Sequence, residues 1–306
     1  MGGHFLAVVN PAAGGGRCGR LAPAALARLR AVGIPIDVAE THATGHATQL
    51  AREAFQQGRR HFLIVGGDGT SYEVVNGIFG GGAAREGNRC TLAFLPLGTG
   101  NSFLRDFVDH KGAEDVDAVA KMMMSGARRQ CDVIRLRHAG GELHYINLLT
   151  LGFAADVADV TNRRFKRWGE LGYIVGVLTC LARLDRRGFP TRTDNAREFD
   201  TRRCLFLAFS NSKFTGGKMM IAPDANPSDG LIEYVRWGPI GRIGLLRNLH
   251  TLFDGTHVTH PLASRAGVRR VEFALDAPVN VMIDGESLHL QCQTLDVLPA
   301  ALDILV

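Results

Sequence analysis

The sequence predicts an α/β nucleotide-binding domain with a parallel sheet, followed by a mostly antiparallel β-sandwich domain. As far as about residue 95, short apolar runs alternate with helical patterns, which is typical of parallel strands covered on both faces. After about residue 131, strand-like segments separated by turn residues predominate. With 306 residues, the chain is long enough for two domains. We expect them at 1–129 and 130–306, with the last residues able to pack back on the first domain.

Each predicted element follows from its local pattern. In the first domain, apolar runs predict strands at residues 5–9, 34–39, 62–65 and 91–95, and helical spacing predicts helices at 21–31, 48–57 and 74–79. In the second domain, strands are expected at 133–137, 143–148, 204–210, 230–237, 268–275, 279–283 and 291–298. Two helical segments, 171–184 and 240–253, interrupt them.

Composition excludes several classes of protein. No apolar run approaches the roughly 20 residues that span a bilayer, and the start is typical of a strand and not of a signal peptide, so we expect a cytoplasmic protein. The six cysteines are scattered, which argues against a disulfide framework and a zinc site. The net charge of +5 suits an anionic ligand or an anionic membrane surface, and we expect no nucleic-acid partner. The pattern leaves the oligomeric state open.

Three glycine clusters follow predicted strands. They are NPAAGGGRCGR after the first strand, GGDGT after the third and PLGTGNS after the fourth. Because the carboxyl ends of parallel strands share one edge, all three should face the same crevice. Glycine permits positive φ and lets backbone N–H groups approach oxyanions. The clusters therefore predict a nucleotide phosphate site, with polar groups from Asp68, Thr70, Thr99 and Asn101.

Two other nucleotide motifs fit less well. Gly14-x-Gly16-x-x-Gly19 matches the dinucleotide fingerprint, but that fingerprint explains neither of the later clusters. A Walker A loop fails because Arg20-Leu21 stands where lysine and a hydroxyl residue are required.

Further motifs extend the pattern through the second domain. VVNPAAGGG, T-x-x-x-GHA from Thr41, VGGDGTSYEVVNG and LPLGTGNSF are followed by INLLTLGFAADV, SNSKFTGGKMMIAPDANPSDGLIEY and IDGES. In this order they resemble the diacylglycerol kinase catalytic-domain family of soluble lipid kinases. Relatives of that family include sphingosine and ceramide kinases and, more distantly, NAD kinases. The resemblance runs from residue 9 to residue 287 and implies an ATP-dependent kinase of lipid hydroxyls.

The resemblance also implies a site for ATP and Mg²⁺. Together with the glycine clusters, it assigns ATP binding to Asn10, Thr41, Gly66, Gly67, Asp68, Gly69, Thr70, Glu73, Gly98, Thr99 and Asn101. It makes Glu286 the general base that takes the proton of the lipid hydroxyl, with Asp284 in support. It places a structural Mg²⁺ at Asn226, Asp229 and the carbonyl of Leu231.

Two positions depart from the family pattern. Ser102 stands where the family usually has an aspartate that serves the Mg²⁺ and water network, and Asn226 stands where some relatives supply a second carboxylate. The carbonyl oxygen of Asn226 remains a suitable ligand. The Ser102 replacement keeps open a nucleotide-binding regulator without catalysis, although Asp68 and Glu286 are intact.

The roles of the two carboxylates are also open. We expect Glu286 to be the base and Asp68 to organise metal and phosphate, but the reverse assignment fits the same residues. Asp284-Gly285 would also favour a plain hairpin turn between two strands. His42 and His46 are better explained by a turn before the second helix than by a metal site.

The substrate is the least determined part. Arg163, Arg164, Lys166, Arg167 and Trp168 precede the apolar segment 171–184, so residues 162–187 could lie on an anionic bilayer or pack on the sandwich with a solvated basic edge. We expect peripheral contact with the inner membrane surface and a lipid acceptor, diacylglycerol before ceramide or a sphingoid lipid. A soluble-substrate kinase of the NAD kinase type would lack the second-domain motifs.

Overall fold

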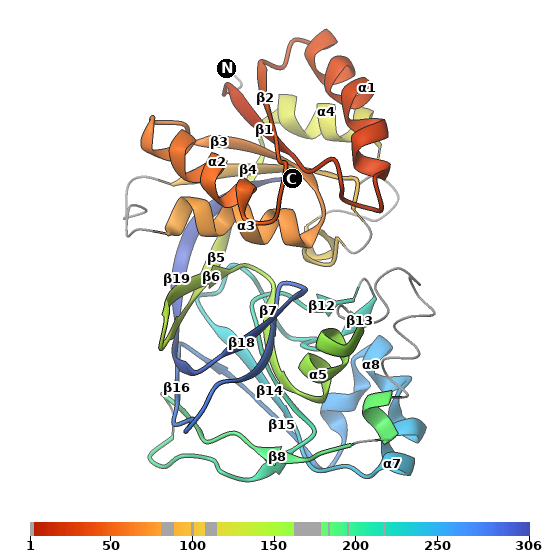
Figure 1. Cartoon of the computed structure of the whole chain (residues 1–306), viewed down its shortest axis with the longest axis vertical. Coiled ribbons are helices and arrows are strands. Elements are labelled where there is room, and N and C mark those ends of the chain that lie inside the picture. Colours follow the sequence, from red (N-terminus) through yellow and green to blue (C-terminus); the bar gives the residue numbers. More distant parts are fainter. Residues whose placement is uncertain are drawn as a thin grey trace. The chain divides into compact units, whose positions relative to one another are not determined.

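The computed structural model describes residues 3–80, 89–98, 101–107, 115–161, 179–182, 184–194, 196–216 and 218–306 (Figure 1). The chain forms two compact units, Met1–Val133 with Leu298–Val306, and Ile134–Val297. The first unit is a mostly parallel α/β sheet domain and the second is built of antiparallel sheets, as the sequence predicts. Within the described residues, no helix is both long and apolar enough to pass through a bilayer.

The first unit alternates strands and helices. Its elements are β1 (Phe5–Val9), α1 (Arg17–Ala31), β2 (Ile36–Glu40), α2 (His46–Gln56), β3 (His61–Gly66), α3 (Asp68–Phe79), β4 (Cys90–Pro96), the 3₁₀ helix η1 (Phe103–Asp106) and α4 (Val116–Ser125). Two long strands, β5 (Arg128–His138) and β19 (Cys292–Leu305), belong in part to each unit. Helix α4 was not predicted from the sequence.

The strand order of this sheet locates a crevice. The order is β2-β1-β3-β4-β19, and every neighbouring pair is parallel. Strand β2 lies on one side of β1, while β3 and β4 lie on the other side. The order therefore reverses between β1 and β3, and ligands in such sheets bind outside the carboxyl ends of the strands at that switch point.

The core of the first unit explains the apolar runs. Ala7, Leu63 and Leu95 point to one face and pack with residues of α1 and α4. Val8 and Ile64, at alternate positions, are also buried and point to the opposite face. Figure 1 shows α1 and α4 on one side of the sheet and α2 and α3 on the other. Because both faces are covered, the strands are continuously apolar and do not alternate with polar residues.

The second unit contains short strands and few helices. Its strands are β6 (Gly141–Tyr145), β7 (Leu148–Gly152), β8 (Arg187–Gly188), β9 (Thr191–Thr193), β10 (Arg203–Cys204), β11 (Phe206–Ser210), β12 (Phe214–Thr215), β13 (Met219–Met220), β14 (Ile232–Trp237), β15 (Ala263–Val268), β16 (Arg270–Phe273), β17 (Val279–Ile283) and β18 (Glu286–Leu290). Its helices include α5 (Phe153–Val160), α7 (Arg242–Asn248), α8 (Thr251–Asp254) and the 3₁₀ helix η4 (Thr256–Thr259).

A six-stranded antiparallel sheet forms the centre of this unit. Its order is β15-β14-β11-β7-β17-β18. On one face, the ring of Phe209 stacks on Tyr234 and meets Phe273 of β16 edge-on. On the other face, Phe206 and Trp237 pack with buried residues of α7 and α8. The sheet is thus apolar on both faces.

Some of the predicted elements differ from the observed ones. The expected strand 143–148 is two strands, because β6 ends at Tyr145 and β7 begins at Leu148. The N–H groups of residues 146–148 turn to the carboxylate of Asp284, which interrupts the ladder. The expected helix 240–253 is the pair α7 and α8, and most of the expected helix 171–184 lies outside the described residues.

Candidate functional site

The three glycine clusters meet at the carboxyl ends of β1, β3 and β4. The N–H of Gly98 donates to the carbonyl of Gly66 at 2.9 Å. A Cβ on Gly98 would lie 2.5 Å from the Cα of Gly67, and a Cβ on Gly14 would lie 2.8 Å from the carbonyl oxygen of Leu97. Side chains at these positions would push the loops apart, so glycine is needed for the close approach.

The first loop turns its backbone in a left-handed conformation before α1. Gly14, Gly15 and Gly16 have φ of 61°, 63° and 86°. Within the described residues, the N–H groups of Gly14 and Gly15 donate to no backbone carbonyl. Successive N–H groups in such a turn, next to the positive end of a helix, are suited to an anion.

Asn10 and Thr70 connect the first and third strands at this edge. The amide Nδ2 of Asn10 donates to Oγ1 of Thr70 at 3.2 Å, and its N–H donates to the carbonyl of Val65 at 2.9 Å. Thr41 joins the same edge, because its N–H donates to the carbonyl of Val9 at 2.8 Å. Gly66 is the last residue of β3 and Gly69 the second residue of α3. The structure thus gathers most of the predicted ATP-binding residues, and Thr99 lies outside the described residues.

Asp68 is the first residue of α3 and places a carboxylate at this edge of the sheet. Both of its carboxylate oxygens accept from the backbone N–H of Ser102 at 3.1 Å. Although part of the residue reaches solvent, protein surrounds the carboxylate, and this burial raises its pKa. Hydrogen bonds from Ser102 and from the backbone of Phe103 act in the opposite direction. Ser102 therefore supports Asp68 directly, a role that sequence reasoning did not assign to it.

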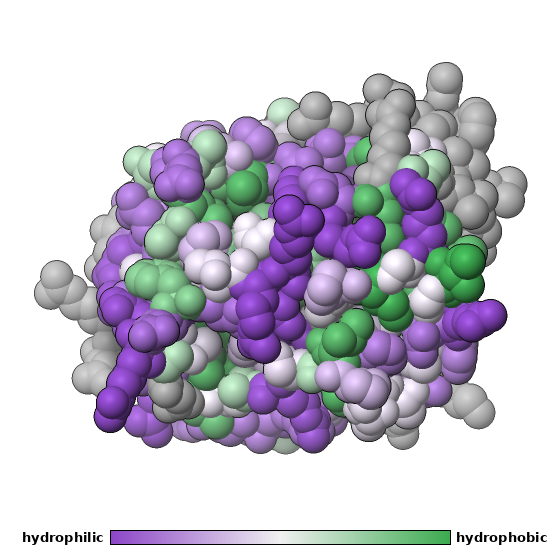
Figure 2. Space-filling model, turned by 90° about the horizontal axis from the view of Figure 1, so that it is seen from below, coloured by the Kyte–Doolittle hydropathy of each residue, from purple (hydrophilic) through white to green (hydrophobic). Residues whose placement is uncertain are grey.

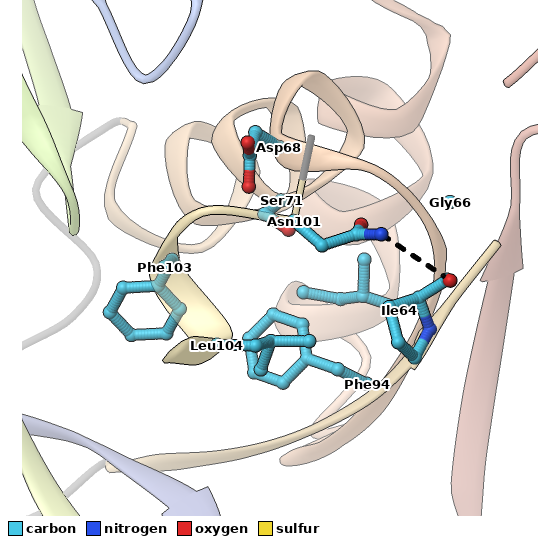
Figure 3. Close-up of a pocket in the computed structure, with 9 residues that line it drawn as sticks. Ile64, Gly66, Asp68, Ser71, Phe94, Asn101, Phe103 and Leu104 are labelled. Carbon is cyan, nitrogen blue, oxygen red and sulfur yellow. Dashed lines mark hydrogen bonds between the residues drawn. The ribbon is translucent and has the colours of Figure 1, made fainter. Parts of the chain in front are cut away.

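A small pocket opens beside Asp68 (Figure 3). Asn101 has a φ of 47°, and its Nδ2 donates to the carbonyl of Gly98 at 3.2 Å. Figure 3 shows the Asn101 amide turned to the Pro96 carbonyl. The lining residues are Ile64, Gly66, Asp68, Ser71, Phe94, Pro96, Asn101, Phe103 and Leu104. Ile64, Phe94, Phe103 and Leu104 were not predicted as site residues. Their only sequence signal is that each lies within a few residues of a glycine cluster or its strand.

Glu73 is fully engaged in holding a neighbouring loop. Its two carboxylate oxygens accept from the N–H groups of Gly45, at 2.8 Å, and Ala47, at 3.0 Å. A carboxylate at this point satisfies free N–H groups of α2 and interacts favourably with the helix dipole. Glu73 thus positions the segment between Thr41 and His46, which is a turn as expected. Its contact with ATP stays a prediction.

Asp284 and Glu286 are in the second unit and have different environments. The carboxylate of Asp284 is buried and accepts from the N–H groups of Ile146, Asn147 and Leu148 at 3.0–3.1 Å. Asp284 and Gly285 have φ of 48° and 90°, and Ile283 pairs with Glu286. This is a two-residue hairpin of the type that Asp-Gly favours. The turn leaves the side chain of Glu286 exposed.

The predicted structural metal site is one turn before β14. Oδ1 of Asn226 accepts from the N–H of Ser228 at 3.2 Å, and Oδ1 of Asp229 accepts from the N–H of Leu231 at 2.9 Å. Oxygen ligands of this kind suit Mg²⁺. Among the described residues, however, no group of three or more acidic, histidine or cysteine side chains is placed to hold a metal ion. The two side chains are engaged in stabilising their own turns, and the metal assignment stays a prediction.

Comparison with known proteins decides the family. The family described as Diacylglycerol kinase catalytic domain matches residues 4–136. The family described as YegS C-terminal NAD kinase beta sandwich-like domain matches residues 147–306, which is more than half of the chain. The chain belongs to the bacterial diacylglycerol kinase and YegS-like lipid kinases. It is a lipid kinase, and its catalytic family uses ATP.

Individual relatives of this lipid kinase match over most of their length. A diacylglycerol kinase of Mycobacterium tuberculosis is 29% identical over 308 residues, covering 99% of this chain and 95% of that protein. A protein of Pseudomonas aeruginosa named "Probable lipid kinase YegS-like" is 30% identical, covering 92% of this chain and 88% of that protein. A crystal structure of a diacylglycerol kinase from Bacillus anthracis has a TM-score of 0.70 at 18% identity, covering 99% and 96%, and shows the same fold.

Proposed function

We propose that this lipid kinase transfers the γ-phosphate of ATP to the hydroxyl of diacylglycerol, with ceramide or a sphingoid lipid as the second choice of acceptor. The observation that carries the proposal is the meeting of three glycine loops at the switch point of the first sheet, beside Asp68. The relative from Mycobacterium tuberculosis, which is similar over nearly the whole chain, is named a diacylglycerol kinase. That likeness favours diacylglycerol over the other lipids.

The first unit would bind the triphosphate. The N–H groups of Gly14 and Gly15, which donate to no backbone carbonyl of the described residues, and the N-terminal ends of α1 and α3 suit phosphate oxygens. Asp68 is the acidic side chain at this edge that can hold a hydrated cation close to the phosphates. Mg²⁺, when bound with ATP, would neutralise charge on the phosphates. Asn10, Thr41, Thr70 and Asn101 would keep the loops in place.

The second unit would supply the base. The lipid oxygen attacks the γ-phosphorus, a new P–O bond forms, the bond from phosphorus to the β–γ bridging oxygen breaks, and ADP leaves with that oxygen. The proton of the lipid hydroxyl passes to the carboxylate of Glu286, which the hairpin leaves exposed. Asp284 positions Glu286 because its carboxylate fixes the turn through the backbone of residues 146–148. This reaction requires the lipid held by the second unit to reach the phosphate held by the first.

The test is transfer of label from [γ-³²P]ATP in mixed micelles with Mg²⁺. Diacylglycerol, ceramide, sphingosine and NAD are offered separately as acceptors. We expect label in the organic phase, with diacylglycerol labelled fastest. Label only in a water-soluble product would contradict the proposal and favour a kinase of the NAD kinase type. ATP binding without any transfer would favour a nucleotide-binding regulator.

Two variants assign the base. Glu286→Gln is expected to lower the turnover number by about 10²–10⁴-fold without weakening ATP binding. Glu198→Gln, at an exposed position of the same unit, is the matched control and should leave turnover unchanged. If Glu286→Gln keeps near-full activity while Asp68→Asn loses it, Asp68 is the base.

A further inference from the structure

Four hydrophobic side chains are exposed within residues 243–262 of the second unit. They are Ile243 and Leu246 on α7, Phe253 on α8 and Leu262 just before β15, with exposed fractions of 68%, 53%, 52% and 42%. We name these four residues the apolar patch. Among the described residues of this unit, every large hydrophobic side chain with such exposure lies in this 20-residue stretch. In Figure 2, hydrophobic surface gathers on the side where α7 and α8 lie in Figure 1.

The patch is not needed for packing of the two short helices. Leu245 of α7 and Leu252 of α8 point inward and are buried in the core with Trp237. Ile243 and Leu246 are three positions apart on α7, which places them on one side of that helix, and Phe253 is exposed on α8. Each of these two short helices thus has one apolar side chain in the core and at least one other in solvent.

The charge around the patch is positive. Arg247 is exposed and makes no ion pair or hydrogen bond with the described residues. Arg242 donates through its guanidinium to the carbonyls of Leu181 and Ala182, at 3.0 and 2.9 Å, and meets no carboxylate in the described part of the chain. The single acid of the stretch, Asp254, accepts from the N–H and hydroxyl of Thr256. Hydrophobic side chains flanked by arginines that meet no carboxylate among the described residues are complementary to anionic lipid headgroups above an apolar layer.

We infer that the apolar patch, with Arg242 and Arg247, docks on the surface of an anionic lipid bilayer. The inference rests on the proposed function, because a lipid acceptor has to be collected from a membrane. A second copy of the chain fits the patch less well. Four side chains, each about half exposed, present on the order of 400 Å², roughly half of the ~800 Å² per partner in a stable interface. A symmetric contact would also bring arginines of the two copies together.

Sedimentation with vesicles tests the docking. The full chain is mixed with vesicles of phosphatidylcholine alone or with phosphatidylglycerol. Ile243→Ser/Leu246→Ser/Phe253→Ser is expected to bind anionic vesicles at least tenfold more weakly than the unchanged chain. Arg247→Gln should lower binding about fivefold to anionic vesicles only. Leu21→Ser/Val32→Ser/Met124→Ser, at exposed hydrophobic positions of the first unit, is the matched control and should bind normally.

Three outcomes have definite meanings. Unchanged vesicle binding of the triple variant overturns the docking surface, provided that its urea unfolding matches the unchanged chain. The single variant Ile243→Ser repeats the test if the triple variant is unstable. A dimer of the unchanged chain that the triple variant disrupts assigns the patch to a second copy and also overturns the inference. Kinase activity of the unchanged chain in detergent micelles is measured in parallel. If that activity is absent, the proposed function is refuted, and the vesicle experiment then tests the docking surface by itself.

Discussion

The backbone N–H of Ser102 lies 3.1 Å from each carboxylate oxygen of Asp68. Ser102, which follows Asn101 with its positive φ, thereby fixes the carboxylate at the start of α3. Burial still raises the pKa of Asp68, so the folded protein binds this proton more tightly than the unfolded chain does. Stability is therefore lost as the pH rises through the raised pKa of the folded state.

Replacing Asp68 should separate stability from activity. We expect Asp68→Asn to keep or raise the free energy of unfolding at pH 7, because it removes a carboxyl whose charged form is disfavoured by burial and retains an acceptor for Ser102. Phosphoryl transfer should fall by about 10²–10³-fold, since an electrostatic group of the site is lost. Urea unfolding and lipid labelling on one preparation measure both, with the exposed Asp276→Asn as control. A clear loss of stability in Asp68→Asn would show that the carboxylate is a structural requirement.

Ser102→Asp would place a second carboxylate against the first. Ser102 is only 2% exposed, so we expect the free energy of unfolding to fall by about 3 kcal/mol in the presence of a chelator. Added Mg²⁺ should restore part of this loss because a cation between the two carboxylates neutralises their repulsion. Ser102→Ala, which removes only the hydroxyl, should cost about 1 kcal/mol without any response to Mg²⁺. Equal stability of the two variants in chelator would contradict the expected repulsion.

Asp284 is expected to matter for folding as well as for activity. Asp284→Ala leaves three buried backbone N–H groups without their acceptor and should cost about 3–5 kcal/mol. Asp284→Asn keeps one acceptor oxygen and tolerates the φ of 48°, so it should cost roughly 1–2 kcal/mol. Urea unfolding followed by tryptophan fluorescence gives the comparison. Equal stability of Asp284→Ala and Asp284→Asn would mean that these contacts contribute little.

Acid should weaken the second unit through His144. Burial lowers the pKa of His144 from 6.5 to about 4, so the unfolded chain takes up the proton first as the pH falls. Stability is full above about pH 6.5 and is lost between pH 6.5 and about 4, by roughly 2 kcal/mol at pH 5. In His144→Gln, the difference between unfolding free energies at pH 7 and pH 5 should shrink by that amount. His250→Gln, at an exposed position, should retain the full difference.

Features that depend on local sequence pattern or on the order of elements along the chain were predicted from the sequence. Strands such as β3 and β4 are buried on both faces, so their apolar runs could be recognised in the sequence. Their glycine loops lie at one edge because the carboxyl ends of parallel strands lie at the same edge of a sheet. The donation from Ser102 to Asp68 and from residues 146–148 to Asp284 join segments 34 and more than 130 positions apart, which no local pattern records. Helix α5 was missed because its residues follow β7 directly and were included in the second-domain motif. The hairpin at Asp284-Gly285 was readable, since that dipeptide favours the required turn.

The end of β19 has a consequence for how the protein is made. Leu302, Asp303 and Ile304 pair in parallel with Cys90, Thr91 and Leu92 of β4, and Leu305 enters the core beside α1 and α4. Residues 1–133 therefore emerge from the ribosome before β19, the strand that covers the edge of β4, has been synthesised. During that interval the nascent sheet exposes an unpaired, apolar edge, which is where strands of other chains attach. Completion of the first unit thus waits for translation of the whole second unit.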